Sequence, residues 1–379
     1  MSDSSDESGE EEEEEVIPSR PKWVRGLTDF TDFAFHPTTC NITTADMDGY
    51  LGIYKYEPGK DCENLLRKRL SKKPLRSLTY SKDASGIFVS SKAGSLRLFD
   101  IEVEKCSQVL MKEESPSYCI SVINHNLVAS GDDDGTLKVW DIRKGSDPII
   151  EEDRCHDFIS CIAVDKHGKF LFATSGDGTM STFNIKRRKF IVQSENTEYD
   201  MSCVGVIKDN KKVIVGTSEG LLLFFNWNEF AAPSDRFPGH PTAVECLTTI
   251  DENVICTGSM DGMIRAVHLL PNRFLGVVGE HHDMPVNKIT VSYDKKFIAS
   301  SANDSTIKFW TVDHLQNTSV DGTAKPQKSL KSKKLVKSGV SGDKFSFMSD
   351  LDKDMTVPTV ESSESEDESD SEVDTEDDT

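Results

Sequence analysis

The 379-residue sequence lacks the features that mark most membrane and secreted proteins. It has no long uninterrupted apolar run and no recognisable signal peptide, so we expect a soluble protein that is not secreted. Its nine cysteines are scattered, with no C-x-x-C pair and no paired spacing. This distribution predicts a reducing compartment, and neither a disulfide framework nor a zinc site.

The sequence also lacks the short motifs of common catalytic sites. There is no glycine-rich phosphate loop of the P-loop or dinucleotide type, no G-x-S-x-G elbow and no H-E-x-x-H pair. We therefore expect a protein that is not an enzyme and that has no cofactor, no metal, no membrane association and no small-molecule substrate.

Basic residues are absent from both ends of the chain. Residues 1–15 hold nine acidic residues and residues 361–379 hold eleven, so the formal charge of −21 leaves only −1 for residues 16–360. Segments with high charge and few apolar residues cannot bury enough surface to fold, so we predict two disordered acidic tails. Four serines of the second tail suit an acid-directed kinase, while plain solubilisation explains the tail equally well: Ser363, Ser365, Ser369 and Ser371.

What the sequence does contain is a β-hairpin pattern over residues 127–141. Leu127 to Ser130 is a short apolar run, and Asp132 to Gly135 has the composition of a tight turn. Thr136 to Trp140 then alternates polar and apolar residues, as a half-buried strand does. The stretch therefore predicts strand, turn and strand.

The hairpin occurs seven times along the chain. Aligning each copy on a turn residue and on the residue six places later gives Asp48/Tyr54, Ala93/Phe99, Asp134/Trp140, Asp177/Phe183, Glu219/Phe225, Asp261/Val267 and Asp304/Trp310. These pairs are spaced by 45, 41, 43, 42, 42 and 43 residues, which is the period of β-propeller blades. Gly239-His240 and Trp140-Asp141 indicate the WD40 type.

We therefore predict an all-β, seven-bladed WD40 β-propeller over residues 16–312. Its blades are expected at about 27–70, 71–112, 113–153, 154–193, 194–234, 235–278 and 279–312. Residues near 20–26 are expected to supply the outer strand of blade 7, with Val16, Ile17, Trp23 and Val24 as anchors. Residues 313–360 are expected to form a linker.

The recurring aspartates suggest a polar network in each blade. In a WD40 blade the turn aspartate lies near a histidine from the preceding loop, and a serine or threonine and a tryptophan extend the bonding. The candidates are Asp48, Asp134, Asp177, Asp261, Asp304, His240, His281, Ser300, Trp140 and Trp310. Catalytic His-Asp pairs are the alternative, but recurrence at the blade period favours the structural role.

Two further groups resemble metal sites. Asp132-Asp133-Asp134 could bind a cation, although one aspartate is assigned to the network and the others suit a solvated turn. His281-His282 has no third ligand at a suitable spacing. We expect no metal at either place.

A second register marks the innermost strand of each blade. Its equivalent positions are Asp32, Ser77, Cys119, Cys161, Cys203, Cys246 and Lys288. Small, weakly polar side chains fit the crowded centre of a propeller, so these cysteines are interpreted as packing residues.

A basic segment follows the blades. Residues 325–337 contain six lysines and no acid: Lys325, Lys328, Lys331, Lys333, Lys334 and Lys337. One interpretation is a nuclear or nucleolar targeting signal with affinity for RNA phosphates, and the other is a solvated linker.

Taken together, these features resemble the WD repeat-containing protein 55 family. The resemblance rests on the seven blades and on two stretches of sequence, Asp32–Pro37 and the blade 3 motif Ala129–Asp141. It also rests on the basic segment followed by Asp343–Leu351 and on the acidic ends. It implies a nucleolar scaffold that serves ribosomal RNA processing and large-subunit assembly. The implied partners are pre-ribosomal assembly factors and, through the basic segment, ribosomal RNA.

Blade 3 supports a different hypothesis as well. Trp140-Asp141-Ile142-Arg143 fits the W-D-x-R pattern of WD40 substrate receptors for cullin-4 ubiquitin ligases. In those proteins the arginine contacts the propeller adaptor of the ligase, so Trp140, Asp141 and Arg143 are candidate adaptor contacts. A solvent-exposed arginine at this place is also ordinary, and both explanations stay open.

Overall fold

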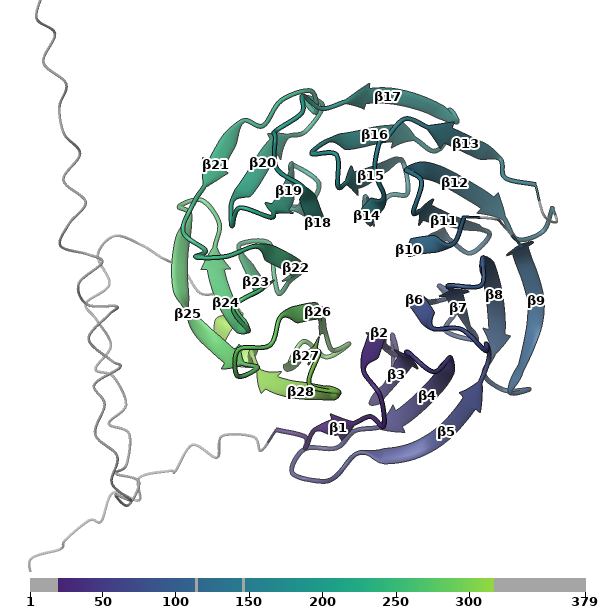
Figure 1. Ribbon diagram of the computed structural model, residues 1–379. Coiled ribbons are helices and arrows are strands. Elements are labelled where there is room, and N and C mark those ends of the chain that lie inside the picture. The colour runs from purple at the N-terminus through teal and green to yellow at the C-terminus, as the bar shows by residue number, and fades with distance from the viewer. Residues whose placement is uncertain (1–19, 113–114, 145–146, 317–379) are drawn as a thin grey trace, which may run out of the picture. The chain divides into compact units, whose positions relative to one another are not determined.

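The computed structural model describes residues 20–112, 115–144 and 147–316. These residues form seven four-stranded antiparallel sheets arranged as blades of a ring (Figure 1). The all-β, seven-bladed propeller predicted from the repeat is thus confirmed. The predicted tails, Val16, Ile17, the lysines of 325–337 and the serines from Ser363 to Ser371 lie outside the described residues.

The first three blades account for twelve strands. Blade 1 contains β2 (Phe30–Phe35), β3 (Asn41–Asp46), β4 (Tyr50–Lys55) and β5 (Glu63–Arg69). Blade 2 contains β6 (Leu75–Tyr80), β7 (Gly86–Ser91), β8 (Ser95–Asp100) and β9 (Lys105–Lys112). Blade 3 contains β10 (Ser117–Asn124), β11 (Leu127–Asp132), β12 (Thr136–Asp141) and β13 (Ile150–Asp153).

The next three blades repeat the pattern. Blade 4 contains β14 (Ile159–Val164), β15 (Phe170–Ser175), β16 (Met180–Asn184) and β17 (Lys189–Gln193). Blade 5 contains β18 (Met201–Ile207), β19 (Lys212–Thr217), β20 (Leu222–Asn226) and β21 (Asp235–Phe237). Blade 6 contains β22 (Val244–Thr249), β23 (Val254–Ser259), β24 (Met263–His268) and β25 (Arg273–Glu280).

Blade 7 draws its strands from both ends of the folded region. It contains β26 (Val286–Val291), β27 (Phe297–Ala302), β28 (Thr306–Thr311) and, as its outer strand, β1 (Val24–Arg25). A 3₁₀ turn, η1 (Asp313–Leu315), follows β28. Within the described ranges, no helix is long and apolar enough to span a membrane.

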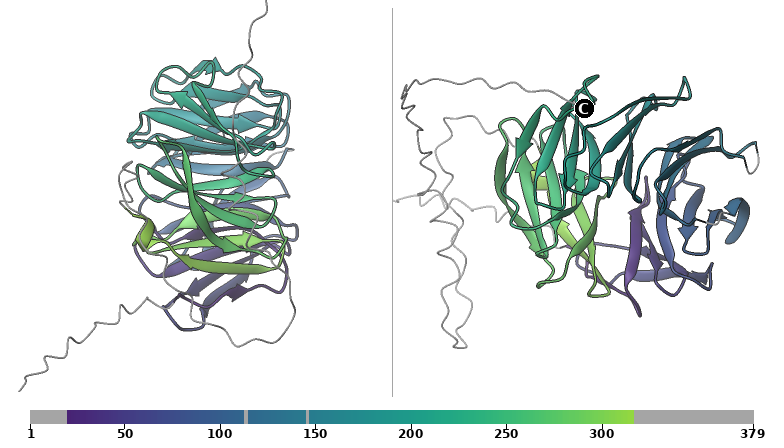
Figure 2. Two further views of the ribbon diagram at one scale, coloured as in Figure 1. Left: turned by 90° about the vertical axis from the view of Figure 1, so that its left-hand side faces the viewer. Right: turned by 45° about the horizontal axis from the view of Figure 1, so that its top comes forward.

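Each blade runs outward from the axis of the ring. The first strand lies nearest the axis and the fourth lies on the rim (Figure 1). Because neighbouring strands are antiparallel, the turns between strands two and three share one end of the ring with the loops that connect blades. We call this end the upper face. The turns between strands one and two and between strands three and four form the lower face, and Figure 2 shows the ring from the side.

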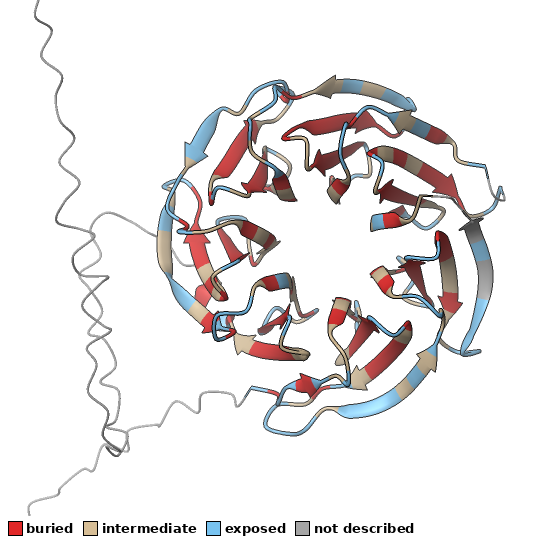
Figure 3. Ribbon diagram, viewed as in Figure 1, coloured by how far each residue is buried: buried red, intermediate tan, exposed pale blue. Residues whose placement is uncertain are grey.

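The core lies between the blades. All residues of β7, β15, β23 and β27 are buried, whereas the outermost strands expose much of their surface (Figure 3). Strands buried on both faces read as continuous apolar runs, as Phe170-Leu-Phe-Ala173 does. One cluster joins Val139 and Ile150 of blade 3 to Leu171 of blade 4, so adjacent blades share their hydrophobic contacts.

The recurring glycine of each turn has a backbone reason. Gly135 has a φ of +86°, a backbone conformation that residues with a Cβ rarely adopt. A Cβ at this position would also collide with the carbonyl oxygen of Cys155. Blade 7 has Ser305 at this place with a φ of +55°. Its hydroxyl donates to Asp29, a contact that a glycine could not make.

The ring closes where β1 pairs with β28. Val24 lies opposite Ile307 and Arg25 opposite Thr306, so residues near 20–26 complete blade 7 as the sequence predicted. The pairing covers an edge that would otherwise be open. Of the two predicted anchors that the structure describes, Val24 is buried, while Trp23 is 42% exposed. The Trp23 ring lies instead under the ammonium group of Lys308, 5.3 Å from its centroid.

Candidate functional site

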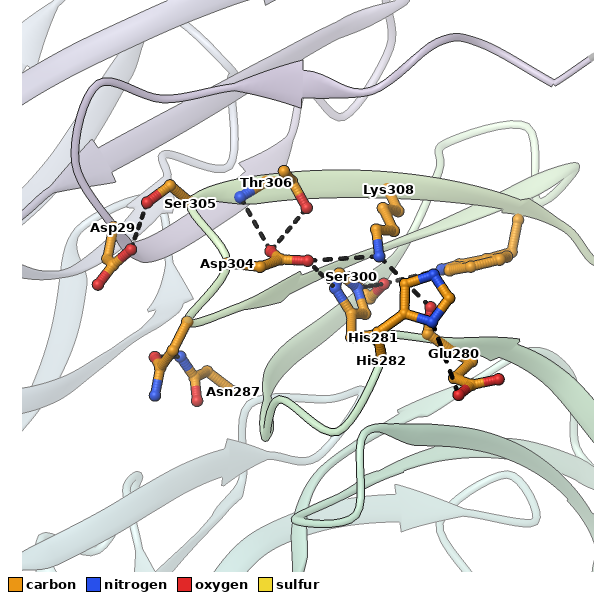
Figure 4. A network of polar contacts seen from close by, with 12 residues as sticks. Asp29, Glu280, His281, His282, Asn287, Ser300, Asp304, Ser305, Thr306 and Lys308 are labelled. Carbon is orange, nitrogen blue, oxygen red and sulfur yellow. Dashed lines mark hydrogen bonds and ion pairs between the residues drawn. The ribbon is translucent and has the colours of Figure 1, made fainter.

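Blade 7 contains a chain of four hydrogen-bonded side chains on its upper side (Figure 4). The Trp310 Nε1–H donates to Ser300 Oγ at 2.8 Å, and Ser300 Oγ lies 2.7 Å from His281 Nε2. His281 Nδ1 lies 3.0 Å from Asp304 Oδ2. Because the indole can only donate, the serine proton points to Nε2 and the imidazole proton sits on Nδ1, facing the carboxylate.

The charges in this chain are fixed by its surroundings. Burial lowers the pKa of His281, so the imidazole is neutral at pH 7. Burial raises the pKa of Asp304, but hydrogen bonds from Thr306 and His281 outweigh it and leave the pKa below its ordinary value. Lys308 Nζ, 3.3 Å from Asp304 Oδ2, completes the group. The result is an ionised carboxylate surrounded by donors.

Serine, histidine and aspartate in this order also occur in hydrolases. Here the Ser300 oxygen already accepts a hydrogen bond from Trp310, and neither Ser300 nor His281 has any exposed surface. A substrate cannot reach the hydroxyl. The hydrogen bonds join β27 and β28 to the loop that contains His281, so we assign the group a structural role.

Blades 1 and 3 differ from the sequence-based assignment. Asp48 and Asp134 were expected in the network, but both side chains are exposed and neither makes a side-chain contact among the described residues. Asp132, two residues earlier, is buried and accepts hydrogen bonds from the backbone of Asp134 and Thr136 at 3.1 and 2.8 Å. Asp46 plays the same part in blade 1. The loops that precede blades 1 and 3 contain no histidine, so Asp48 and Asp134 lack the partner that Asp304 has in blade 7.

Trp140 nevertheless keeps its bond in blade 3. Its Nε1–H donates to Ser130 Oγ at 2.8 Å, the counterpart of the bond between Trp310 and Ser300. Asp132, Asp133 and Asp134 do not converge on one point, because Asp133 pairs with Arg76 and Asp134 faces solvent. Within the described residues, no group of three or more candidate ligands could hold a metal ion.

Blades 4 and 6 hold their turn aspartates in other ways. Asp177 accepts hydrogen bonds from the backbone N–H of His156 at 2.8 Å and from the Thr179 hydroxyl at 2.7 Å. In blade 6, Arg265 binds both oxygens of Asp261, at 3.1 and 2.6 Å. Asp261 is therefore a turn aspartate as predicted, but it pairs with an arginine.

His240, the expected partner of Asp261, bonds elsewhere. Its Nε2 lies 2.9 Å from the Thr257 hydroxyl, while its buried Nδ1 has no hydrogen-bond partner among the described residues. Burial, together with the nearby charge of Arg265, lowers the pKa of His240 to about 4. The histidine is thus neutral at pH 7.

The innermost strands are joined from blade to blade by thiols. Cys119 Sγ donates to the carbonyl oxygen of Ile159 and Cys246 Sγ to that of Val286, both at 3.3 Å. Burial raises the pKa of Cys119 well above its ordinary value, so the thiol stays protonated and able to donate. At the point where blades 7 and 1 meet, Lys288 forms an ion pair with buried Asp32 instead.

The W-D-x-R residues of blade 3 lie on the lower face. Asp141 is buried and accepts two hydrogen bonds from the Arg143 side chain, from Nε at 2.9 Å and from Nη2 at 2.8 Å. These bonds lower the pKa of Asp141 to about 2. The Arg143 side chain remains 62% exposed. Asp141 thus fixes one edge of the guanidinium and leaves the other edge open.

Arg143 also belongs to a cleft of about 860 Å³, which we call the lower cleft. Lower-face loops of blades 2, 3 and 4 contribute its basic and histidine residues: Lys82, His125, Arg143, Lys166, His167, Lys186 and Arg188. Its two acids are already engaged, Asp141 with Arg143 and buried Asp165 with backbone N–H groups. The lining is therefore strongly cationic.

Sequence reasoning missed this cleft. Lys82, Lys186 and Arg188 are exposed and have no ion-pair partner among the described residues. One signal was visible, because Lys186-Arg187-Arg188-Lys189 is a run of four basic residues in a blade that was assigned only structural roles. The convergence of three blades on one cleft has no comparable signal in the sequence.

Comparison with known proteins agrees with the architecture. Residues 21–315 match the WDR55 family model. The rat (Rattus norvegicus) WD repeat-containing protein 55 is 34% identical over 345 residues, which cover 89% of this chain and 88% of its own. The human (Homo sapiens) protein is 35% identical over 76% of each chain. A homolog from Drosophila melanogaster is 35% identical over 77% of this chain and 58% of its own. The chain therefore belongs to the WD repeat-containing protein 55 family.

Proposed function

We propose that this protein is a non-catalytic scaffold of ribosome biogenesis. It works in the nucleus and nucleolus, where it supports ribosomal RNA processing and large-subunit assembly. Family membership supports the scaffold role, because a WD40 propeller offers two faces and a rim to partners. The observation that supports contact with ribosomal RNA is the cationic lower cleft.

The lower cleft suits phosphate contacts that are not base-specific. Its five lysines and arginines come from four loops of three blades, so they are spread out instead of focused on one point. Exposed lysine and arginine side chains neutralise backbone phosphates and release counterions, which supplies affinity without sequence preference. Lys166 already pairs with Asp209 at 3.0 Å, but such an exposed pair is weak and exchanges readily. The lysines of 325–337 would add further phosphate contacts.

If RNA binds at the lower face, other surfaces of the propeller remain available to protein partners. RNA bound at the lower face would occupy blades 2 to 4. The upper face and the rim would remain free for pre-ribosomal assembly factors.

A pull-down with a charge-neutralised lower cleft tests the proposal. The variant Lys82→Gln/Lys186→Gln/Arg188→Gln is compared with wild type for recovery of precursor ribosomal RNA. The matched control removes three exposed lysines from the lower face of blades 1 and 7: Lys60→Gln/Lys295→Gln/Lys296→Gln. Loss of two or three phosphate contacts should flatten the log–log salt dependence by about 2. Equal recovery with all three proteins would overturn the proposal.

The targeting role of the basic segment has its own test. Replacing the six lysines of 325–337 with glutamine should disperse the protein from the nucleolus in fluorescence images. Nucleolar staining identical to wild type would remove the segment from the proposal. The lower cleft would then stand alone.

A second candidate is a substrate receptor for a cullin-4 ubiquitin ligase. The favouring observation is that buried Asp141 holds Arg143 by two hydrogen bonds while most of the side chain stays exposed. Arg143→Ala should abolish capture of the ligase adaptor. Arg154→Ala is the control, because Arg154 is also exposed and also pairs with an acid two residues away. Adaptor recovered with neither protein, or equally with all, would leave only the ribosomal role.

A further inference from the structure

Three blades carry a cation four residues after the turn aspartate of the aligned repeat, and each pairs with a carboxylate. The pairs are Lys138 with Asp132 at 3.8 Å, Arg265 with Asp261 at 2.6 Å and Lys308 with Asp304 at 3.3 Å. The cation and the carboxylate come from opposite sides of one upper-face turn. This position of a blade is therefore built for an ion pair.

Blade 2 keeps the cation and lacks the carboxylate. Arg97 occupies the position, while Ala93 stands where blades 6 and 7 have aspartate and Ser91 stands where blades 1 and 3 have it. The other members of the network are replaced as well. Leu70 takes the place of His281, since each donates its backbone N–H to the turn glycine of the preceding blade. Val89 and Phe99 replace serine and tryptophan.

The guanidinium of Arg97 is left with unused donors. Its Nη1–H donates to the carbonyl oxygen of Leu70 at 2.6 Å. Its Nε is buried and has no partner among the described residues, and no ion pair of Arg97 exists there. Nη2 makes no hydrogen bond among the described residues and, unlike Nε, is not closed off from solvent, so it is the donor that an external acceptor would bind.

A hollow of about 450 Å³ adjoins this arginine on the upper face, and we call it the blade 2 hollow. Besides Ala93 and Arg97 it is lined by residues of the connection from blade 1, namely Arg69, Leu70, Ser71, Lys72 and Lys73. Four of these seven residues are cationic and none is acidic. Lys72 and Lys73 are exposed and have no ion-pair partner within the described ranges.

We propose that the blade 2 hollow binds a carboxylate or phosphoserine of an acidic segment of a partner protein. The incoming group takes the place of the missing turn aspartate and pairs with Arg97, as Asp261 pairs with Arg265. Lys72 and Lys73 at the mouth attract the neighbouring acids of the segment. This site is distinct from the lower cleft, which lies on the opposite face.

The hollow favours a peptide over RNA for two reasons. None of its lining residues is aromatic, so it has no platform for nucleobase stacking. Its size fits one or two side chains, and the sister blades show that an aspartate carboxylate is the group that suits this cation. A guanidinium binds such a group with two parallel hydrogen bonds.

The test restores the missing carboxylate. Ala93→Asp is made in the full-length protein, and binding of a fluorescently labelled peptide of alternating serine and glutamate, unphosphorylated or phosphorylated, is followed by anisotropy. The matched control is Lys92→Gln, which lowers the net charge equally at an exposed neighbour that does not line the hollow. All proteins keep residues 361–379, so any competition from the chain's own acidic end is the same.

Ala93→Asp should weaken peptide binding at least about tenfold, because the new side chain occupies Arg97. Lys92→Gln should bind within about twofold of wild type, and Lys72→Gln/Lys73→Gln should lose affinity and salt dependence. A melting temperature at or above that of wild type verifies that Ala93→Asp is folded. Unchanged peptide affinity of both hollow variants overturns the proposal, and so does a loss confined to a labelled single-stranded RNA. Because no lower-cleft residue is altered, either result leaves the ribosomal proposal to its own test.

Discussion

Blades 7 and 2 occupy equivalent places in the ring but are stabilised differently. Blade 7 has the complete chain from Trp310 through Ser300 and His281 to Asp304. Blade 2 has an apolar or small residue at each of these four places, and its Phe99, Leu96 and Ile87 are fully buried. Both blades fold, so apolar packing between neighbours is sufficient for a blade. The polar network adds to this packing in blade 7, and the described residues of blade 2 fold without it.

The absence of a turn carboxylate from blade 2 leaves the charge of Arg97 available to a partner. In blade 7 the turn carboxylate of Asp304 pairs with both His281 and Lys308, whereas blade 2 has Arg97 without the corresponding carboxylate. A cation that has no internal partner at the surface can bind an acidic group of another molecule. Divergence among repeats thus creates recognition chemistry without changing the backbone.

Giving blade 7 the residue of blade 2 should have the largest effect on stability. His281→Leu leaves the buried Ser300 hydroxyl without its acceptor and removes one of the donors to Asp304, which keeps Thr306 and Lys308. Unpaired buried polar groups cost about 1–3 kcal/mol each, so we expect a loss of about 3 kcal/mol in the free energy of unfolding by urea denaturation. His156→Leu, at an exposed histidine of blade 4, should change it by less than about 0.5 kcal/mol. Equal losses for both would contradict the network.

The histidine of blade 6 should make stability depend on pH. The folded-state pKa of His240 is about 4, below the ordinary 6.5, so the unfolded chain takes up a proton first as the pH falls. Stability is therefore fully present above pH 6.5 and is lost as the pH drops toward 4. From pH 7 to pH 5 this histidine should account for about 2 kcal/mol. His240→Gln should lose less between the two pH values, and an identical loss would show that other groups are responsible.

Blade 3 separates the buried aspartate from the exposed one. Asp132→Ala removes the acceptor of two turn N–H groups and the partner of Lys138, so it should cost about 1–2 kcal/mol. Asp134→Ala should stay within about 0.5 kcal/mol, because its side chain is solvated. Both variants are compared with wild type in thermal and urea unfolding. A larger effect at Asp134 would restore the sequence-based assignment.

Giving blade 2 the residue of blade 7 should have the smallest effect and the opposite sign. Ala93→Asp places a carboxylate beside the unpaired donors of Arg97, in a turn where aspartate is favourable. A partly exposed pair of this kind should raise the free energy of unfolding by about 0.5 kcal/mol. Lys92→Gln is again the charge-matched control. A lower stability for Ala93→Asp than for this control would mean that the blade 2 turn cannot hold an aspartate.

The sequence predicted the propeller well because the repeat is local. Hairpin spacing, turn glycines and apolar runs each depend on a few neighbouring residues, and together they determined seven blades and the closing role of residues 20–26. The blade 7 network was also visible, since its four residues recur at the WD40 spacing.

Choices that depend on burial were not visible. Asp132 and Asp134 are both turn aspartates, and only the three-dimensional path of β11 puts one inside and the other in solvent. The pairing of Asp261 with Arg265 instead of His240 reflects a competition that spacing does not reveal. The lower cleft and the blade 2 hollow join residues from separate blades, so no single stretch of sequence describes them.

The pairing of β1 with β28 also has a consequence in time. A ribosome makes Val24 long before Ile307, and at about 5–20 residues per second the interval is on the order of tens of seconds. Throughout that interval β1 lacks β28, the strand that it pairs with, and blade 7 is incomplete. A chain that stalls late in synthesis would hold six finished blades beside an open sheet edge. The last residues of the propeller thus determine when the newly made protein covers its open sheet edge.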